Sequence, residues 1–288
     1  MLTSQNAVRH NLSSPEGRRA TVEEGTAFFI KMQKILQPDL ALEIGAREAS
    51  FSLTMRHLFP NIPVIAYEGS PKAYTFFANK NNYAGKGIRY INSVVADMDG
   101  TTKFNVLNQT DDPKGPAGTN GRNSLNDRDY DTRFTYSSLD VESVTGDTVL
   151  EKEGSRNATL WIDVEGASKQ VLEGLHQSLT QKRIASIYIE TESRKIWENQ
   201  WLCFDVIDCL LSHGYLPIYK DDELNIQGNL IFIREESLRG DLFECLSHEL
   251  IRRDKMSTRL EKLEAQITSL EENMINVCSL LTKFMQAK

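Results

Sequence analysis

The alternation of apolar and polar residues between positions 39 and 70 predicts a strand, a helix and a second strand in succession. Leu40 to Ile44 is a short apolar run that meets a tight turn at Gly45. The residues from Ala46 to Phe59 then carry apolar side chains at helical spacing, and a second apolar run from Pro63 to Tyr67 stops at Glu68. This order describes one βαβ unit, in which ligands bind at the carboxyl ends of the strands.

Similar segments continue to about Glu236 and define one α/β domain over residues 21–236. We expect residues 1–20 to be flexible. A capping box formed by Thr21 and Glu24 should then start a helix that runs to Gln37 and packs on the edge of the sheet. Further helices are expected at 71–83, 168–179 and 201–213, strands at 88–97, 102–107, 134–141, 158–162 and 184–189, and a terminal hairpin at 215–219 and 229–234. The polar stretch 108–131 is expected to be a mobile lid or substrate loop.

Five of the predicted strands end in an acidic residue. These acids are Glu43, Glu68, Asp97, Asp163 and Glu190. Because the carboxyl ends of parallel strands meet at one side of a sheet, we expect the five side chains to reach a common site. In nucleotide-binding sheets an acid about 20 residues after the glycine turn accepts hydrogen bonds from ribose hydroxyls, and Glu68 stands near that distance from the turn. A plain tight turn followed by a solvated loop acid explains this one unit equally well.

Asp163 and Glu165 stand two positions apart directly after an apolar strand, with Gly166 behind them. Alternate residues of an extended segment point to the same side, so the two carboxylates are expected to share one face. Such a pair binds a metal ion, acts as a general base or caps the following helix, and the sequence leaves these roles open. No diagnostic metal-ligand spacing accompanies it. We expect His176 and His213 to serve in packing or capping.

Composition restricts the class of protein further. The 288 residues carry 40 acidic and 33 basic side chains, and this formal charge of −7 argues against a nucleic-acid-binding protein. Four cysteines show neither metal-ligand spacing nor a disulfide-rich pattern. The sequence has no signal-peptide core and no run of about 18 apolar residues. We therefore expect a cytoplasmic protein without a membrane span.

A heptad pattern of apolar residues occupies the last part of the chain. Spacings of four and three alternate without a break through Met256, Leu260, Leu263, Ile267, Leu270, Met274, Val277, Leu281 and Phe284. This pattern predicts that residues 240–288 form a coiled-coil helix through which the protein assembles as a homo-oligomer. A long helix folded back on the domain is the alternative, and the seam does not decide between a dimer and a trimer.

The segment IDVEGASKQVLEGL at positions 162–175 is the most specific motif of the chain. EIGA at 43–46, AYEGSP at 66–71 and VVADMDGTTKF at 94–104 precede it. Over residues 39–234 this order resembles the FkbM-type S-adenosylmethionine-dependent methyltransferases. The resemblance implies a Rossmann-like class I methyltransferase sheet, mostly parallel with an antiparallel last strand. It also implies methyl transfer to a hydroxyl, often of a sugar in a glycan, polysaccharide or natural product.

The resemblance further implies which residues bind S-adenosyl-L-methionine. Two positions depart from the family pattern: Ser168 stands where a further acid is usual, and a glycine follows the ribose acid where proline is common. The implied cofactor-binding residues are Glu43, Gly45 and Ala46 at the methionine end, Glu68 and Gly69 at the ribose, Ala96 and Asp97 at the adenine, and Asp163 at the methyl-transfer site.

A hydroxyl acceptor requires a general base within hydrogen-bond reach. Our first candidate is Asp163, and Glu165 and Glu190 are the alternatives. The acceptor is not named by the sequence, although a polyhydroxylated small molecule or glycan is compatible with the acidic strand ends.

Two other functions compete with an O-methyltransferase. A catalytically inactive methyltransferase fold would serve as a scaffold that assembles through its coiled coil. A nicotinamide dehydrogenase is less favoured, because Gly45 stands without the two further glycines that let the backbone approach a pyrophosphate.

Overall fold

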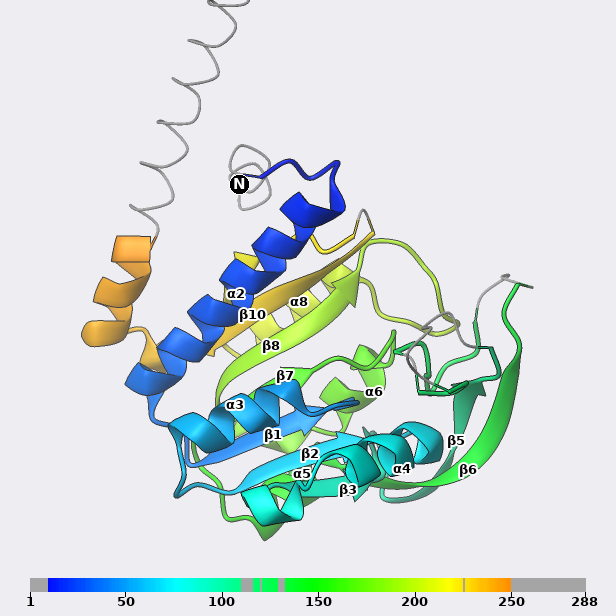
Figure 1. Cartoon of the computed structure of the whole chain (residues 1–288). Helices are drawn as coiled ribbons and strands as arrows, with labels where there is room; N and C mark the ends of the chain where they lie inside the picture. Colours follow the sequence, from blue (N-terminus) through cyan, green and yellow to red (C-terminus); the bar gives the residue numbers. More distant parts are fainter. Residues whose placement is uncertain (1–9, 110–115, 120, 129–132, 225, 250–288) are drawn as a thin grey trace, which may run out of the picture.

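A seven-stranded, mostly parallel sheet forms the centre of the protein (Figure 1). The computed structural model describes residues 10–109, 116–119, 121–128, 133–224 and 226–249. The strands of this sheet are β1 (Leu40–Ile44), β2 (Val64–Glu68), β3 (Arg89–Asn92), β7 (Ala158–Ile162), β8 (Ile184–Glu192), β9 (Tyr215–Lys220) and β10 (Gln227–Arg234). Their order across the sheet is β3-β2-β1-β7-β8-β10-β9.

The chain runs outward from the middle of the sheet in both directions. β1 pairs in parallel with β2 on one side and with β7 on the other, and β7 pairs in parallel with β8. β10 then pairs antiparallel with both β8 and β9. The predicted mostly parallel sheet with an antiparallel end is therefore confirmed.

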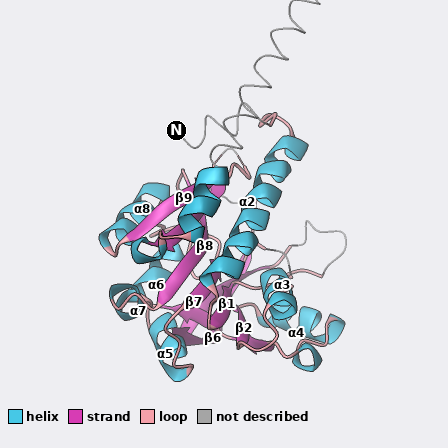
Figure 2. Ribbon diagram, turned by 90° about the vertical axis from the view of Figure 1, so that its left-hand side faces the viewer, coloured by secondary structure: helices cyan, strands magenta, loops and turns pink. Residues whose placement is uncertain are grey.

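Helices cover both faces of the sheet (Figure 2). One face carries a core built with α2 (Pro15–Leu36), α3 (Ser50–Leu58), α4 (Pro71–Lys80) and the helical residues 241–249. The other face carries a core built with α5 (Gly146–Lys152), α6 (Ser168–Glu173), α7 (His176–Thr180) and α8 (Cys203–Ser212). Short 3₁₀ turns, η1 (Ala84–Lys86) and η2 (Glu235–Ser237), complete the elements.

The first helix differs from its prediction at its start. α2 begins at Pro15, because Ser14 caps it by accepting a hydrogen bond from the N–H of Gly17, and a proline at the first position already has a helical φ. The expectations that residues up to 20 are flexible and that the helix starts at Thr21 were therefore wrong for residues 15–20.

The same helix lies across a face of the sheet and not at its edge. Phe29 of α2 packs against Trp161 of β7 and Tyr188 of β8, at ring-centroid distances of 6.1 and 5.5 Å. Trp161 and Tyr188 are neighbours in the β7–β8 register and stack with centroids 3.7 Å apart. This aromatic layer fixes α2 to the centre of the sheet, which corrects the predicted packing.

The predicted strand at 88–97 is divided between two sheets. β3 belongs to the main sheet, but beyond Ser93 the chain enters a three-stranded sheet of β4 (Val94–Ala96), β6 (Tyr136–Thr145) and β5 (Gly100–Leu107), in that order. The Ser93 hydroxyl donates to the carbonyl of Glu142 in β6 at 2.9 Å and stabilises the transfer. Asp97 consequently does not end a strand of the main sheet, as predicted, but lies exposed.

The described chain ends in helical residues that pack on the domain. Leu242, Cys245 and Leu246 are buried in the core that α2 also fills. Residues 250–288 lie outside the described residues, so the coiled coil and the assembly through residues 240–288 stay predictions. Within the described residues, every helix is too short or too polar to cross a bilayer.

Glycine substitutions at two positions should separate steric from conformational effects on stability. A Cβ on Gly174 would lie 1.9 Å from the carbonyl oxygen of Ala96, whereas Gly154 has open space but a φ of +65°. We expect Gly174→Ala to lower the free energy of unfolding by about 3 kcal/mol. Gly154→Ala should cost about 1 kcal/mol, from its backbone conformation alone. Urea denaturation measures both, and equal losses would contradict the close approach of α6 to β4.

Candidate functional site

A cavity of about 670 Å³ opens at the carboxyl ends of the central strands. It lies where β1 and β7 are neighbours and the chain departs to opposite sides, which is the usual ligand position in open α/β sheets. Most of the site residues predicted from the sequence line this cavity: Glu43, Gly45, Ala46, Glu68, Gly69, Asp163, Glu165 and Glu190.

The glycine turn after β1 holds three strand ends together. The N–H groups of Gly45 and Ala46 both donate to the carbonyl of Tyr67, at 3.0 and 2.9 Å. Gly45 has a φ of +79°, and a Cβ there would lie 1.8 Å from the carbonyl oxygen of Asp163. Only glycine fits this position, because the conformation and the space both exclude a side chain.

Glu68 is buried at the end of β2 with its carboxylate in the cavity wall. One oxygen accepts the N–H of Arg47 at 2.8 Å and the other accepts the N–H of Ser70 at 2.7 Å. Burial raises the pKa of Glu68, and these two hydrogen bonds oppose the rise. Each carboxylate oxygen retains a lone pair, so the group can accept two further donors such as vicinal hydroxyls.

Glu43 is engaged by the helix that follows the turn. Its two oxygens accept the N–H groups of Phe51 and Ser52, in the first turn of α3, at 3.2 and 2.7 Å. Burial raises the pKa of Glu43 to about 7. Glu43 therefore fixes α3 to β1 and shapes the cavity from below the glycine turn.

Asp163 follows β7 and its side chain faces the cavity. The residue is open to the cavity's solvent although protein surrounds it. Burial raises the pKa of Asp163 to about 7, and the charge of Glu223 adds to the rise. A hydrogen bond with Glu190 opposes it.

Glu165 has a left-handed backbone conformation, with a φ of 46°. Burial raises its pKa well above the usual range, and Arg122 and Arg128 oppose the rise. The N-cap position of α6 belongs to Ala167 and carries no side-chain cap hydrogen bond. Capping of α6 is thus not the role of Glu165.

Part of the polar stretch 108–131 packs directly on the IDVEGA motif. The Ser124 hydroxyl donates to the carbonyl of Glu165 at 2.7 Å, and the Asn126 amide donates to the carbonyl of Gly166 at 2.8 Å. Ser124 also pairs with Asn105 of β5 through the backbone. Residues 121–123 and 125 line the cavity. Residues 110–115, 120 and 129–131 lie outside the described part, so a lid stays a prediction.

The structure does not bring every predicted residue to the cavity. Asp97 is exposed and Ala96 is buried against Gly174, and neither lines the cavity. Ser93, with the two valines that follow it, lines this wall instead. His176 and His213 face each other away from the cavity, with ring nitrogens 3.3 Å apart.

Among the described residues, the acids Glu48, Glu192 and Glu223 lie in or near the site and were missed by the sequence reasoning. Glu192 stands two positions after Glu190 on β8, and this i, i+2 spacing is the signal that was already noted for Asp163 and Glu165. Glu223 lies in the β9–β10 connection and lines the cavity. Its position depends on the geometry of the β9–β10 hairpin, which no local sequence pattern predicts.

The arrangement suits an uncharged or cationic ligand that presents hydroxyl groups. Apolar Val94 and Phe104 line the cavity on the side of Glu68, while carboxylates line the side toward β8. Among the described residues, no three acidic, histidine or cysteine side chains are disposed to hold a metal ion.

Comparisons with known proteins identify the family of the chain. The methyltransferase FkbM domain matches residues 43–217. The 2-O-methyltransferase NoeI of Sinorhizobium fredii (strain NBRC 101917 / NGR234) is 25% identical over 182 residues, which cover 61% of this chain and 73% of NoeI.

Solved structures show only distant likeness. Methyltransferase FkbM from Methylobacillus flagellatus KT is 11% identical with a TM-score of 0.42, over 68% of this chain and 43% of that one. This chain therefore spans less than half the length of that structure. Magnesium protoporphyrin IX methyltransferase (ChlM) from Synechocystis PCC 6803, solved with bound SAM, is 9% identical with a TM-score of 0.42, over 75% and 79% of the two chains. The domain match covers more than half of the sequence, so the chain belongs to the FkbM methyltransferase family.

Proposed function

We propose that this protein is an S-adenosylmethionine-dependent O-methyltransferase whose acceptor is a hydroxyl of a sugar or sugar-containing molecule. The observation that carries the proposal is the buried carboxylate of Glu68 beside the Gly45 turn, within a cavity large enough for a cofactor and an acceptor. The name of the relative NoeI, a 2-O-methyltransferase, supports oxygen as the methylated atom.

The residues present fit the cofactor by their chemistry. Glu68 has free lone pairs for the ribose hydroxyls. Val94 and Phe104, which touch the position of Gly69, offer apolar surface for an adenine. The turn at Gly45 and Ala46 would lie at the methionine end, and Asp163 would lie near the transferred methyl group. When bound, S-adenosylmethionine supplies an activated methyl group on a positively charged sulfur.

The chain's own contribution to transfer is to orient the acceptor hydroxyl and to remove its proton. Asp163 is the best placed of the three candidate bases, because its side chain faces the open cavity. Glu190 is nearly buried, and Glu165 lies beside two arginines. A pKa of about 7 lets Asp163 accept a proton at neutral pH and release it afterwards.

The competing scaffold function predicts that the cavity binds no cofactor. Calorimetric titration of the purified protein with S-adenosylmethionine and, separately, with NAD distinguishes the two hypotheses. We expect micromolar binding of the first and none of the second. Failure to bind either would favour the scaffold, and binding of NAD alone would favour the dehydrogenase. The cytoplasmic location and the homo-oligomer remain part of this proposal.

Replacement of Glu68, the proposed ribose-binding acid, should weaken the binding of the cofactor. Glu68→Gln removes the charge that two hydroxyl donors would bond, so we expect the dissociation constant of S-adenosylmethionine to rise by roughly ten- to a hundredfold. Asp97→Asn is the matched control, since Asp97 is exposed outside the cavity. Calorimetry measures both variants, and equal affinities would remove Glu68 from the site.

The pH dependence of methyl transfer should follow the ionisation of Asp163. The base must be deprotonated to act, and burial raises its pKa to about 7, so activity should be lost as the pH falls through this value. We expect kcat to rise about tenfold between pH 6 and pH 8. Asp163→Asn should lower kcat by about a hundredfold or more and abolish this rise. A variant that keeps the wild-type pH profile would assign the base to another residue.

A further inference from the structure

Several acids of the cavity already have partners. Glu43 and Glu68 accept the backbone N–H groups described above. Glu48 lies 3.2 Å from the guanidinium of Arg47. Glu165 is offset by two arginines, at positions 122 and 128. Each of these acids therefore already has a hydrogen-bond donor or a positive charge of the protein beside it.

Three further acids, Asp163, Glu190 and Glu223, line the side of the cavity toward β8, and Glu192 follows Glu190 on that strand outside the cavity lining. This acidic set consists of Asp163, Glu190, Glu192 and Glu223. Burial raises the pKa of Glu190 well above its usual range, and the other three members raise it further. Asp163 also raises the pKa of Glu192, which burial brings to about 7. The four groups thus repel one another when they are ionised.

The set also contains carboxylate oxygens that lack hydrogen bonds. Glu190 lines the cavity and is 9% exposed, and its Oε2 has no hydrogen-bond partner among the described residues. Glu192 is 1% exposed, and its Oε1 also has no hydrogen-bond partner among the described residues. A buried acceptor without a donor costs about 1–3 kcal/mol. The unsatisfied oxygen of Glu190, which lines the cavity, points to a ligand that brings donors and positive charge.

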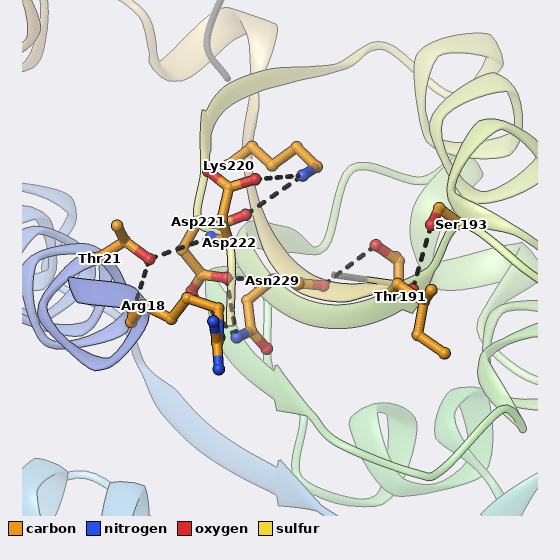
Figure 3. Close-up of polar contacts among 10 residues, drawn as sticks. Arg18, Thr21, Thr191, Ser193, Lys220, Asp221, Asp222 and Asn229 are labelled. Carbon is orange, nitrogen blue, oxygen red and sulfur yellow. Dashed lines mark hydrogen bonds and ion pairs between the residues drawn. The ribbon is translucent and has the colours of Figure 1, made fainter. Parts of the chain in front are cut away.

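Glu223 belongs to the β9–β10 connection, and Figure 3 shows the polar contacts of the two residues before it, Asp221 and Asp222. The Asn229 amide donates to Glu223 at 3.1 Å and to both oxygens of the fully buried Asp221, at 3.2 and 3.0 Å. The N–H of Asp222 donates to the Thr21 hydroxyl of α2 at 3.0 Å. The hairpin connection is therefore fixed to α2, and Glu223 is positioned before any ligand arrives.

We propose that the acidic set binds an ammonium group of the acceptor, so that the substrate is a hydroxylated amine such as an amino sugar with a free amine. This inference rests on the proposed methyltransferase function. The methionine end of the cofactor carries one net positive charge, which cannot offset four carboxylates. An acceptor ammonium supplies both the missing charge and up to three hydrogen-bond donors.

An organic cation fits this set better than a divalent metal ion. A metal requires several ligand atoms at about 2.0–2.6 Å from one point. The described acids, histidines and cysteines provide no such group of three. An ammonium on an extended acceptor needs only two or three acceptors within hydrogen-bond distance.

Paired sugars test the proposal by binding. The protein, saturated with S-adenosylhomocysteine, is titrated calorimetrically with glucosamine and with glucose, in which a neutral hydroxyl of similar size replaces the ammonium group. We expect at least about tenfold tighter binding of glucosamine. The new positive charge should also lower the raised pKa values of Asp163, Glu190 and Glu192. Binding near pH 7 should therefore release protons, measured as a dependence of the heat on the ionisation enthalpy of the buffer.

Variants of the acidic set test whether its carboxylates cause the preference for glucosamine. Glu190→Gln and Glu223→Gln should each reduce the preference for glucosamine by about tenfold. Glu198→Gln removes the same charge from an exposed position outside the cavity and should keep the preference. Thermal denaturation of each variant establishes that it is folded.

The outcomes separate the two proposals. Equal binding of the two sugars, or binding of neither to a protein that binds S-adenosylhomocysteine, overturns the amine site and leaves the methyltransferase proposal standing. Micromolar binding of Mg²⁺ or Mn²⁺ that is lost in Glu190→Gln also overturns it, in favour of a metal. A protein that binds no cofactor refutes both proposals.

Discussion

The parallel pairing of β1 with β7 is the constraint on which the site depends. The N–H of Asp163 donates to the carbonyl of Ile44 at 3.0 Å, so the two strand ends stay in register to their last residues. At the next position the chains approach so closely that only Gly45 fits. This contact opens the cavity on one side of the sheet and points the acids of β7 and β2 into it.

Burial of carboxylates gives the site its chemistry. Glu43 and Glu68 are buried with backbone N–H donors, and this arrangement fixes their orientation. Asp163 is enclosed by protein near other acids, and this arrangement raises its pKa toward neutrality. Glu43 therefore has a structural role, while cofactor binding by Glu68 and proton acceptance by Asp163 are the roles that we propose, and the difference lies in which groups each carboxylate meets.

The sequence predicted most elements because their apolar periodicity is strong, and the βαβ unit from β1 to β2 is found with its glycine turn and its acid. The prediction failed where the local pattern carries no information. The residues on both sides of Ser93 have the same strand-like sequence pattern, yet β3 belongs to the main sheet and β4 to the three-stranded sheet. Asp97 therefore lies outside the site. The hairpin acid Glu223 is brought to the cavity by pairing between strands, which hydrophobic spacing does not encode.

The anchoring of residues 121–128 has a consequence for the divergence of acceptor specificity. Ser124 and Asn126 bond the carbonyls of Glu165 and Gly166, so this loop is attached to the motif that carries the candidate base. A loop exchanged between relatives to change the acceptor would disturb that motif unless it retained both side chains. Asn123 adds a further constraint, because its side chain accepts the N–H of Leu107 and donates to the carbonyl of Gly118.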